Sequence, residues 1–294
     1  MKKQIIIIYG ATASGKSALA LEMAKKQESV IINADSMQIY KEIPIITAQP
    51  TQEQQNAATH KLYGIISLFG NGQNNIYDNK QESFSVAKWL DLVKEIIDES
   101  LNKNITPIIV GGTAMYLNSL IYGITPMPDI ETNIRAQVRN YAHENGNEIL
   151  YNKLIKHDPN IAKNININDT QRIIRSYEIL EQTGQSILYW QEQPKRILYP
   201  HDSFELHFLN PDREIIYQRC NERFIEMIKN NVIEEVNNIY LQSKQYNITL
   251  PKAVGIKEII LYLEEKISLE EAIKLSQTAT RQYAKRQLTW FRKL

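Results

Sequence analysis

The chain has 294 residues, 43% of them hydrophobic, and a formal net charge of +1 at pH 7. This length can bury a substantial core, as one large or two moderate domains. The balanced charge excludes a strongly basic or acidic protein, so a polyanionic partner would have to bind a local patch. Cys220 is the one cysteine, which excludes an intramolecular disulfide and a zinc site built from several cysteines.

The N-terminal segment predicts a site for a diphosphate group. The apolar run Ile5–Ile8 reads as a buried strand, and a helix follows from Ser17 to about Lys26. Between them stands a G-x-x-x-x-G-K-S loop, made of Gly10, Ala11, Thr12, Ala13, Ser14, Gly15, Lys16 and Ser17. In this context backbone N–H groups and the helix N-terminus bind an anion, Lys16 adds a positive charge, and the Ser17 hydroxyl can ligate Mg2+. The loop indicates which group is bound, but not which reaction follows.

Strands and helices alternate along the first part of the chain. Further strands are predicted over 30–34 and 107–110, and helices over 85–101 and 115–121. Such alternation predicts a parallel α/β sheet whose functional loops lie at the carboxyl ends of its strands. The Asn- and Gln-rich stretch 71–81 predicts a mobile surface loop.

After residue 126 the pattern changes to helices alone. Two helices are predicted over 129–142 and 148–157. A third has Asn168 as its N-cap, Gln171 at capping-box spacing, and Gly184 at its end.

The alternating segment 204–209 predicts a strand that returns to the sheet, and helices follow over 213–229, 233–242, 255–265 and 269–294. We therefore expect a P-loop NTPase-like α/β core with a helical C-terminal segment, formed by residues 1–126 and 201–294. Residues 127–200 form an inserted all-helical domain.

Two strand ends could carry chemistry. Asp35 follows the second strand and opens onto the same edge as the phosphate loop, where it could ligate Mg2+, accept a proton, or merely cap the next turn. Gly111–Thr113 follows the later strand, where hydrolysing P-loop enzymes commonly place an acid. The two glycines argue against an NTP hydrolase and favour close approach of a substrate to the backbone.

Two helical faces are candidates for RNA contact. Gln171, Arg172 and Arg175 fall within one arc of roughly 100°, opposite Ile173. They form either a solvated face or a surface for phosphates and base edges.

The last helix has no acidic residue after Glu271 and carries Lys274, Arg281, Lys285, Arg286, Arg292 and Lys293, interleaved with Tyr283, Trp290 and Phe291. Ala284, Leu288 and Phe291 form its apolar stripe. The cations either stabilise the helix C-terminus or bind an RNA backbone.

These motifs, in this order, resemble the tRNA dimethylallyltransferase (tRNA isopentenyltransferase) family. They are GATASGKS at 10–17, DSMQIY at 35–40, PIIVGGTAMYL at 107–117, NDTQRIIRSYEIL at 168–180, ERFIEMI at 222–228, KAVGIKE at 252–258 and TRQYAKRQLTWFR at 280–292. The resemblance implies an enzyme that transfers a dimethylallyl group from dimethylallyl diphosphate to N6 of the adenosine just 3′ of the anticodon in tRNA. The implied products are N6-(dimethylallyl)adenosine and diphosphate.

The resemblance also implies roles for single residues. The implied catalytic residues are Asp35 as general base, Thr113 at the target adenosine, and Arg223 with Lys16 and Ser17 at the diphosphate. Contacts with the tRNA anticodon stem–loop are implied for Asp35, Ser36, Met37, Gln38, Thr113, Arg135, Gln171, Arg172, Ile173, Ile174 and Arg175. Ala11, Gln49, Lys61 and Ala114 stand where the family usually has other residues. The implied cofactor is Mg2+, bound at Ser17, and we expect a monomer.

No run approaches the roughly 18 apolar residues that span a bilayer, so we expect a soluble, cytoplasmic protein without a membrane partner. Two rival functions stay open from the residues alone. A P-loop kinase would use ATP and a small acceptor, whereas a non-catalytic RNA-binding protein would leave Lys16, Ser17 and Asp35 without a purpose.

Overall fold

The computed structural model describes residues 4–70, 84–292 and 294, and the predicted surface loop over 71–81 and Lys293 lie outside them. The chain divides into two compact units. The larger contains residues 1–121 and 198–294, and the smaller contains residues 122–197. These junctions fall a few residues before the domain boundaries drawn from the sequence.

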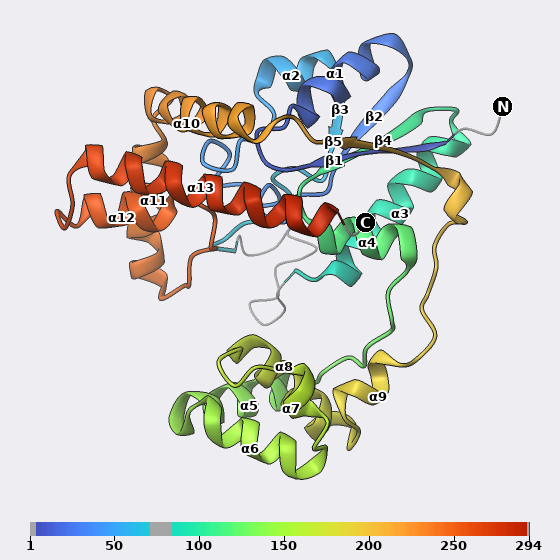
Figure 1. Ribbon diagram of the computed structural model, residues 1–294, viewed down its shortest axis with the longest axis vertical. Helices are drawn as coiled ribbons and strands as arrows, with labels where there is room; N and C mark the ends of the chain where they lie inside the picture. The colour runs from blue at the N-terminus through green and yellow to red at the C-terminus, as the bar shows by residue number, and fades with distance from the viewer. Residues whose placement is uncertain (1–3, 71–83, 293) are drawn as a thin grey trace. The chain divides into compact units, whose positions relative to one another are not determined.

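The larger unit is built on a parallel sheet (Figure 1). Its described residues form five strands: β1 (Ile5–Gly10), β2 (Ser29–Asn33), β3 (Thr59–Lys61), β4 (Thr106–Gly111) and β5 (Phe204–Leu209). Their order is β3-β2-β4-β1-β5, and the register pairs Ile8 with Val110 on one side and His207 on the other. The predicted parallel α/β class is therefore confirmed, and so is the return of residues 204–209 to the sheet.

Side chains of β1 alternate between the two faces of the sheet, because successive residues of a strand point to opposite sides. Ile6 and Ile8 pack with Ala20 of α1 (Lys16–Lys26). On the opposite face Tyr9 stacks on Phe208 with ring centroids 5.1 Å apart and meets the edge of the Phe291 ring at 5.4 Å.

Three further helices cover this second face: α3 (Val86–Asn102), α4 (Ala114–Tyr122) and α13 (Leu269–Phe291), of which α3 and α4 lie on the side away from α1 in Figure 1. Both faces of the sheet are thus buried, which explains the unbroken apolar runs of β1 and β4.

The remaining helices of the larger unit are α2 (Gln52–Ala57), α10 (Arg213–Lys229), α11 (Val232–Tyr246) and α12 (Ile256–Leu263), with a short 3-10 turn at His201–Ser203. Helices α10 to α13 pack against one another. Their shared core includes Phe224, Val236, Ile239 and Ile259, all buried. This helical C-terminal segment closes over the carboxyl edge of the sheet, because Ile43 and Ile46 from the loop after β2 join the same core.

The smaller unit is helical and has a core of its own. Its helices are α5 (Thr132–Asn145), α6 (Asn147–His157), α7 (Ile161–Asn164), α8 (Thr170–Thr183) and α9 (Ile187–Gln191). Val138, Leu150, Ile173 and Ile179 are among its buried residues. Among the residues that the structure describes, no helix combines the length and apolar content that a membrane span needs.

Three local predictions are corrected. The N-cap of α8 is Asp169 and not Asn168, because Asp169 Oδ1 accepts a hydrogen bond from the Arg172 N–H at 3.2 Å. Helix α5 starts at Thr132 rather than 129, and Ile130 just before it is buried in the core of the smaller unit. The edge strand β3 was not predicted, because Thr-His-Lys has neither an apolar run nor alternation.

Trp89 anchors helix α3 to the backbone of β2 on the second face of the sheet. It is fully buried, its Nε1 donates to Asn33 O at 2.8 Å, and its ring stacks on Tyr116 with centroids 4.6 Å apart. Trp89→Phe removes the hydrogen bond and part of the packed volume, so it is expected to lower the free energy of unfolding by about 2–3 kcal/mol. Urea unfolding followed by far-UV circular dichroism measures the change. Trp290→Phe, at a residue 55% exposed on α13, is the matched control, and equal stability of the two variants would contradict the prediction.

Candidate functional site

The phosphate loop has the backbone geometry that an anion cradle needs. Gly10 has a φ of 152°, and a Cβ there would lie 2.3 Å from Leu209 O, so no larger residue fits. Gly15 adopts a left-handed conformation, with φ of 100°, directly before α1. Ser14 Oγ is buried and has no hydrogen-bond partner among the described residues. A buried hydroxyl without a partner inside a helix-terminal loop fits an oxyanion that would accept its hydrogen.

Lys16 lies beneath the loop and is bound by it. Its Nζ donates to Ala11 O at 2.6 Å, so Ala11 serves the site through its carbonyl group. Burial of the ammonium group lowers the pKa of Lys16 to about 8, partly opposed by the charge of Asp35. A cation that sheds its hydration in this way is prepared for a strong anionic ligand.

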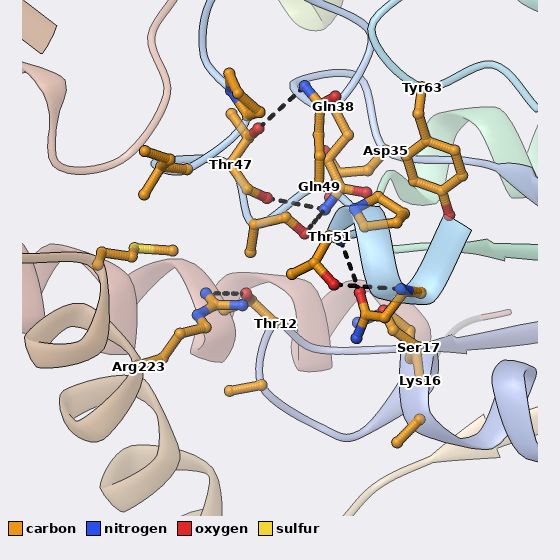
Figure 2. Close-up of a pocket in the computed structure, with 18 of the residues that line it drawn as sticks. Thr12, Lys16, Ser17, Asp35, Gln38, Thr47, Gln49, Thr51, Tyr63 and Arg223 are labelled. Carbon is orange, nitrogen blue, oxygen red and sulfur yellow. Dashed lines mark hydrogen bonds between the residues drawn. The ribbon is translucent and has the colours of Figure 1, made fainter. Parts of the chain in front are cut away.

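Arg223 brings a second cation to the loop from α10. Its Nη2 donates to Thr12 Oγ1 at 2.5 Å, as Figure 2 shows. Arg223 is half-buried, and this burial lowers the pKa of its guanidinium, which lies close enough to Asp35 for the two charges to interact. Two cations from distant parts of the sequence therefore meet at one loop.

Asp35 is held by backbone geometry at the end of β2. The side chain of Asn33, itself fully buried, accepts from the Asp35 N–H at 2.7 Å and donates to Asp35 O at 3.0 Å. Asp35 Oδ1 accepts from the Met37 N–H at 3.0 Å, so the carboxylate does cap the next turn. Burial raises the pKa of Asp35, while Met37, Lys16 and Arg223 oppose the rise. A basic carboxylate beside two cations can accept a proton.

Thr113 is tied to the same turn. Its Oγ1 accepts from the Ser36 N–H at 2.9 Å and donates to Ser36 Oγ at 3.2 Å. The Gly111 Cα lies so close to Ala34 that an added Cβ would stand 2.1 Å from Ala34 O. The glycines after β4 are therefore needed for the approach of the β2 backbone, which brings Thr113 next to Asp35–Ser36.

A cavity of about 1070 Å³ opens between these groups and α10 (Figure 2). Its polar lining includes Thr12, Lys16, Ser17, Asp35, Gln38, Tyr63, Arg219 and Arg223. Its apolar lining includes Pro44, Ile45, Ala48, Pro50 and Met227. Its lining also includes the carboxylates of Glu222 and Glu226 on α10. One cavity thus offers cations, carboxylates and an apolar wall, and an amphipathic anion needs the cations and the apolar wall.

Apart from Met227, which belongs to α10, the apolar wall belongs to the loop after β2. Hydrogen bonds from polar side chains hold this loop in place. The Glu235 carboxylate of α11 accepts from the N–H groups of Ile45 and Ile46 at 2.7 and 2.8 Å. Gln38 Nε2 donates to the carbonyl groups of Thr47 and Ala48, both at 2.8 Å. These contacts fix the wall. Gln49, where the family usually has another residue, also lines the cavity, and its side chain donates a hydrogen bond to Tyr40 O at 2.7 Å.

The other predicted contacts lie in the smaller unit. Gln171 and Arg172 are exposed at the start of α8, and Arg135 is half-buried on α5. Arg175 Nη2 donates to Pro128 O at 3.3 Å, and its Nη1 lies 3.6 Å from a carboxylate oxygen of the buried Glu178. Ile173 is fully buried in the core, so its side chain is not available to a ligand.

The last helix separates its cations from its apolar stripe. Lys285, Arg286 and Trp290 are exposed, whereas Ala284, Leu288 and Phe291 are buried. Phe291 packs against Tyr9 of β1 and Phe208 of β5, so its ring is not available on the expected RNA face.

Sequence reasoning missed Gln287, which is 5% exposed and lies inside the stripe. The available signal was its spacing, since 284, 287, 288 and 291 share one helical face and Gln287 alone among them is polar.

A metal would find few ligands from the chain itself. Among the described residues no group of three or more His, Cys, Asp or Glu side chains could hold an ion. Ser17 is exposed to the cavity beside Lys16 and supplies a hydroxyl oxygen. This donor set fits Mg2+, which keeps several waters and binds through one or two protein oxygens together with substrate phosphates.

Comparisons with known proteins identify the family of the chain. A family model described as IPP transferase matches residues 38–294, and one described as isopentenyl transferase matches residues 3–69. The tRNA dimethylallyltransferase of Rickettsia bellii (strain OSU 85-389) is 45% identical over 291 residues, covering 99% of this chain and 88% of that protein. The enzyme of that name from Rickettsia conorii is also 45% identical, covering 99% and 77%.

Solved structures give the same result. The full-length tRNA isopentenylpyrophosphate transferase from Bacillus halodurans aligns with a TM-score of 0.65 and 31% identity, covering 100% of this chain and 88% of that one. A eukaryotic dimethylallyltransferase acting on tRNA aligns with a TM-score of 0.76 and 27% identity, covering 98% and 70%. Match to the family model over most of the chain and 45% identity to relatives along nearly all of it lead to one conclusion: the chain belongs to the IPP transferase family.

Proposed function

We propose that this protein transfers a dimethylallyl group from dimethylallyl diphosphate to N6 of the adenosine just 3′ of the anticodon in tRNA. The observation that carries the proposal is the meeting of Asp35, Lys16 and Arg223 at one cavity with an apolar wall. Membership of the family and relatives named tRNA dimethylallyltransferase support it.

The cavity suits the donor at both of its ends. The diphosphate is assigned to the loop N–H groups, Lys16 and Arg223, and the dimethylallyl group to the wall that includes Ile45 and Met227. Charge accumulates on the diphosphate as its bond to the allylic carbon breaks. Positive groups already held in place stabilise that charge without reorganising, which lowers the barrier.

Ser17 is assigned as the protein ligand of Mg2+, the proposed cofactor. Mg2+ held by Ser17 and the diphosphate would supply positive charge to the leaving group.

Asp35 is assigned as the general base. The N6 nitrogen attacks the allylic carbon, the carbon–oxygen bond to diphosphate breaks with its electron pair on the oxygen, and the Asp35 carboxylate takes the N6 proton. An exocyclic amine is a weak nucleophile, so loss of its proton as the new bond forms is needed. Thr113, hydrogen-bonded to Ser36, is assigned to the adenosine, with Ser36, Met37 and Gln38 beside it.

The RNA is assigned to exposed cations of both units. In the smaller unit these are the exposed Arg172, with Gln171 beside it, and the half-buried Arg175 and Arg135 contribute their outer atoms. On α13 they include Lys285 and Arg286. The target base leaves its stack to reach a cavity inside the larger unit. We expect a monomer to be active, in the cytoplasm where tRNA is found.

The direct test is transfer from dimethylallyl diphosphate to unmodified tRNA with Mg2+, followed by nucleoside analysis. Asp35→Asn is expected to lower the single-turnover rate by about 10²–10⁴-fold, because a positioned base contributes about that much. Binding of RNA and of the diphosphate is expected to stay nearly unchanged.

ATP provides the control for the rival kinase. ATP with Mg2+, with and without tRNA, is expected to release neither ADP nor phosphate. Robust ATP turnover without modified adenosine would overturn the proposal in favour of a kinase or ATPase. RNA binding without either reaction would favour the non-catalytic alternative.

The pH dependence of kcat/KM is expected to be bell-shaped. Activity rises with pH as Asp35 loses its proton through a pKa that burial raises. It falls above about pH 8, where Lys16 loses the charge that binds the diphosphate. Because a guanidinium stays protonated, Lys16→Arg is expected to remove the alkaline limb even where it lowers the rate. An alkaline limb that persists in Lys16→Arg would assign it to another group.

Gln171→Ala and Arg175→Ala are expected to weaken tRNA binding without changing affinity for the allylic diphosphate. Loss of Arg175 is expected to reduce the slope of log affinity against log salt by about 1, as for one lost phosphate contact. Gln185→Ala, at an exposed residue just beyond α8, is the matched control. Separate titrations of the two ligands decide the matter, and a selective loss of diphosphate binding would place α8 at the donor site instead.

A further inference from the structure

Gln287 of α13 makes two hydrogen bonds across the carboxyl edge of the sheet. Its Oε1 accepts from the Thr12 N–H at 2.7 Å, and its Nε2 donates to Gly112 O at 2.8 Å. The side chain is buried, with 5% of its area exposed. It therefore bridges the phosphate loop and the residue after β4, just beyond Tyr9 and Gly111, the last residues at which β1 and β4 pair.

The bridge fits tightly. A Cβ added to Gly112 would stand 2.3 Å from Gln287 Nε2, so the glycine is needed for the amide to reach the carbonyl group. The orientation of the amide is fixed as well, because its oxygen faces a backbone donor and its nitrogen faces a backbone acceptor.

The two residues that Gln287 joins are each next to a residue of the proposed reaction. Thr12, on one side, accepts from Arg223 through its hydroxyl. Gly112, on the other side, precedes Thr113, which is bonded to Ser36. Tyr283, one turn before Gln287 on α13, lies beside the Gln287 side chain and near enough to Asp35 to feel its charge.

We propose that Gln287 is a positioning residue that sets the distance between the diphosphate loop and the adenosine side of the site. The inference rests on the proposed transfer reaction and adds a residue to it. In transfer between two bound substrates, the rate depends on how closely the reacting atoms are held in line, and a misplacement of about 1 Å can cost about 10²-fold. A residue that hydrogen-bonds to both the phosphate loop and the segment before Thr113 is placed to control that alignment.

The test is Gln287→Met, which keeps the length of the side chain and removes both hydrogen bonds. We expect the single-turnover rate at saturating substrates to fall about 10²-fold, with Kd for dimethylallyl diphosphate and for tRNA, each measured alone, within about threefold of wild type. Gln282→Met makes the same chemical change at an exposed position of the same helix and is expected to behave as wild type.

Gln287→Glu separates positioning from general damage to the fold. A protonated glutamic acid can reproduce both bonds, since its carbonyl oxygen accepts and its hydroxyl donates, whereas a carboxylate faces Gly112 O with no hydrogen. Burial favours the protonated form. The rate of Gln287→Glu relative to wild type is therefore expected to rise as pH falls through the pKa of the new carboxyl group, while the ratio for Gln287→Met stays flat.

The outcomes are distinct. If wild type transfers the dimethylallyl group and folded Gln287→Met keeps its rate within about threefold, the inference is wrong and the proposed function stands. A fall that appears wholly in the affinity for either substrate, or a pH-independent ratio for Gln287→Glu, also overturns it. If wild type itself transfers nothing, the proposed function has failed, and that is seen before any variant is compared.

Discussion

Parallel pairing of β2, β4 and β1 is the constraint on which the site depends. Parallel strands end at one edge, so three segments far apart in the sequence, the phosphate loop, Asp35 and Thr113, emerge side by side. The backbone fits this closely, since Ala34 N donates to Val110 O at 2.8 Å and Thr113 N donates to Ala34 O at 3.1 Å. A side chain at Gly111 would push β2 away and separate the carboxylate from the threonine.

The charges at the site also affect one another's pKa values. Lys16, Arg223 and Asp35 are each half-buried, and burial is the largest influence on the pKa of each. A diphosphate that binds the two cations offsets their charge near Asp35. The pKa of Asp35 then moves further upward, because the cations that opposed the rise are neutralised. Under the proposed function, donor binding strengthens the base on which the acceptor depends.

Most of the fold and part of the site could be predicted from the sequence. The phosphate loop, the four apolar or alternating strands and most of the helices follow from local patterns, because periodicity and glycine placement are local properties. Residues whose role depends on distant contacts were not accessible in that way. Gln287 and Glu235 each bind backbone groups more than 150 residues away, and their own surroundings in the sequence do not indicate this. The cap of α8 was misplaced by one residue, because Asn168 and Asp169 are both good caps and only the geometry selects between them.

The 275 residues between Thr12 and Gln287 have a consequence for biosynthesis. Domains fold as they leave the ribosome, at about 5–20 residues per second, so roughly 15–55 s separate the appearance of the phosphate loop from that of its partner on α13. Strand β5 and Arg223 also arrive late, after the whole helical unit has been made. Translation thus delivers a nascent chain that carries its anion loop early and completes the surroundings of that loop last. A ribosome that stalls within α13 before Gln287 therefore leaves the loop without the hydrogen bond between Thr12 and Gln287.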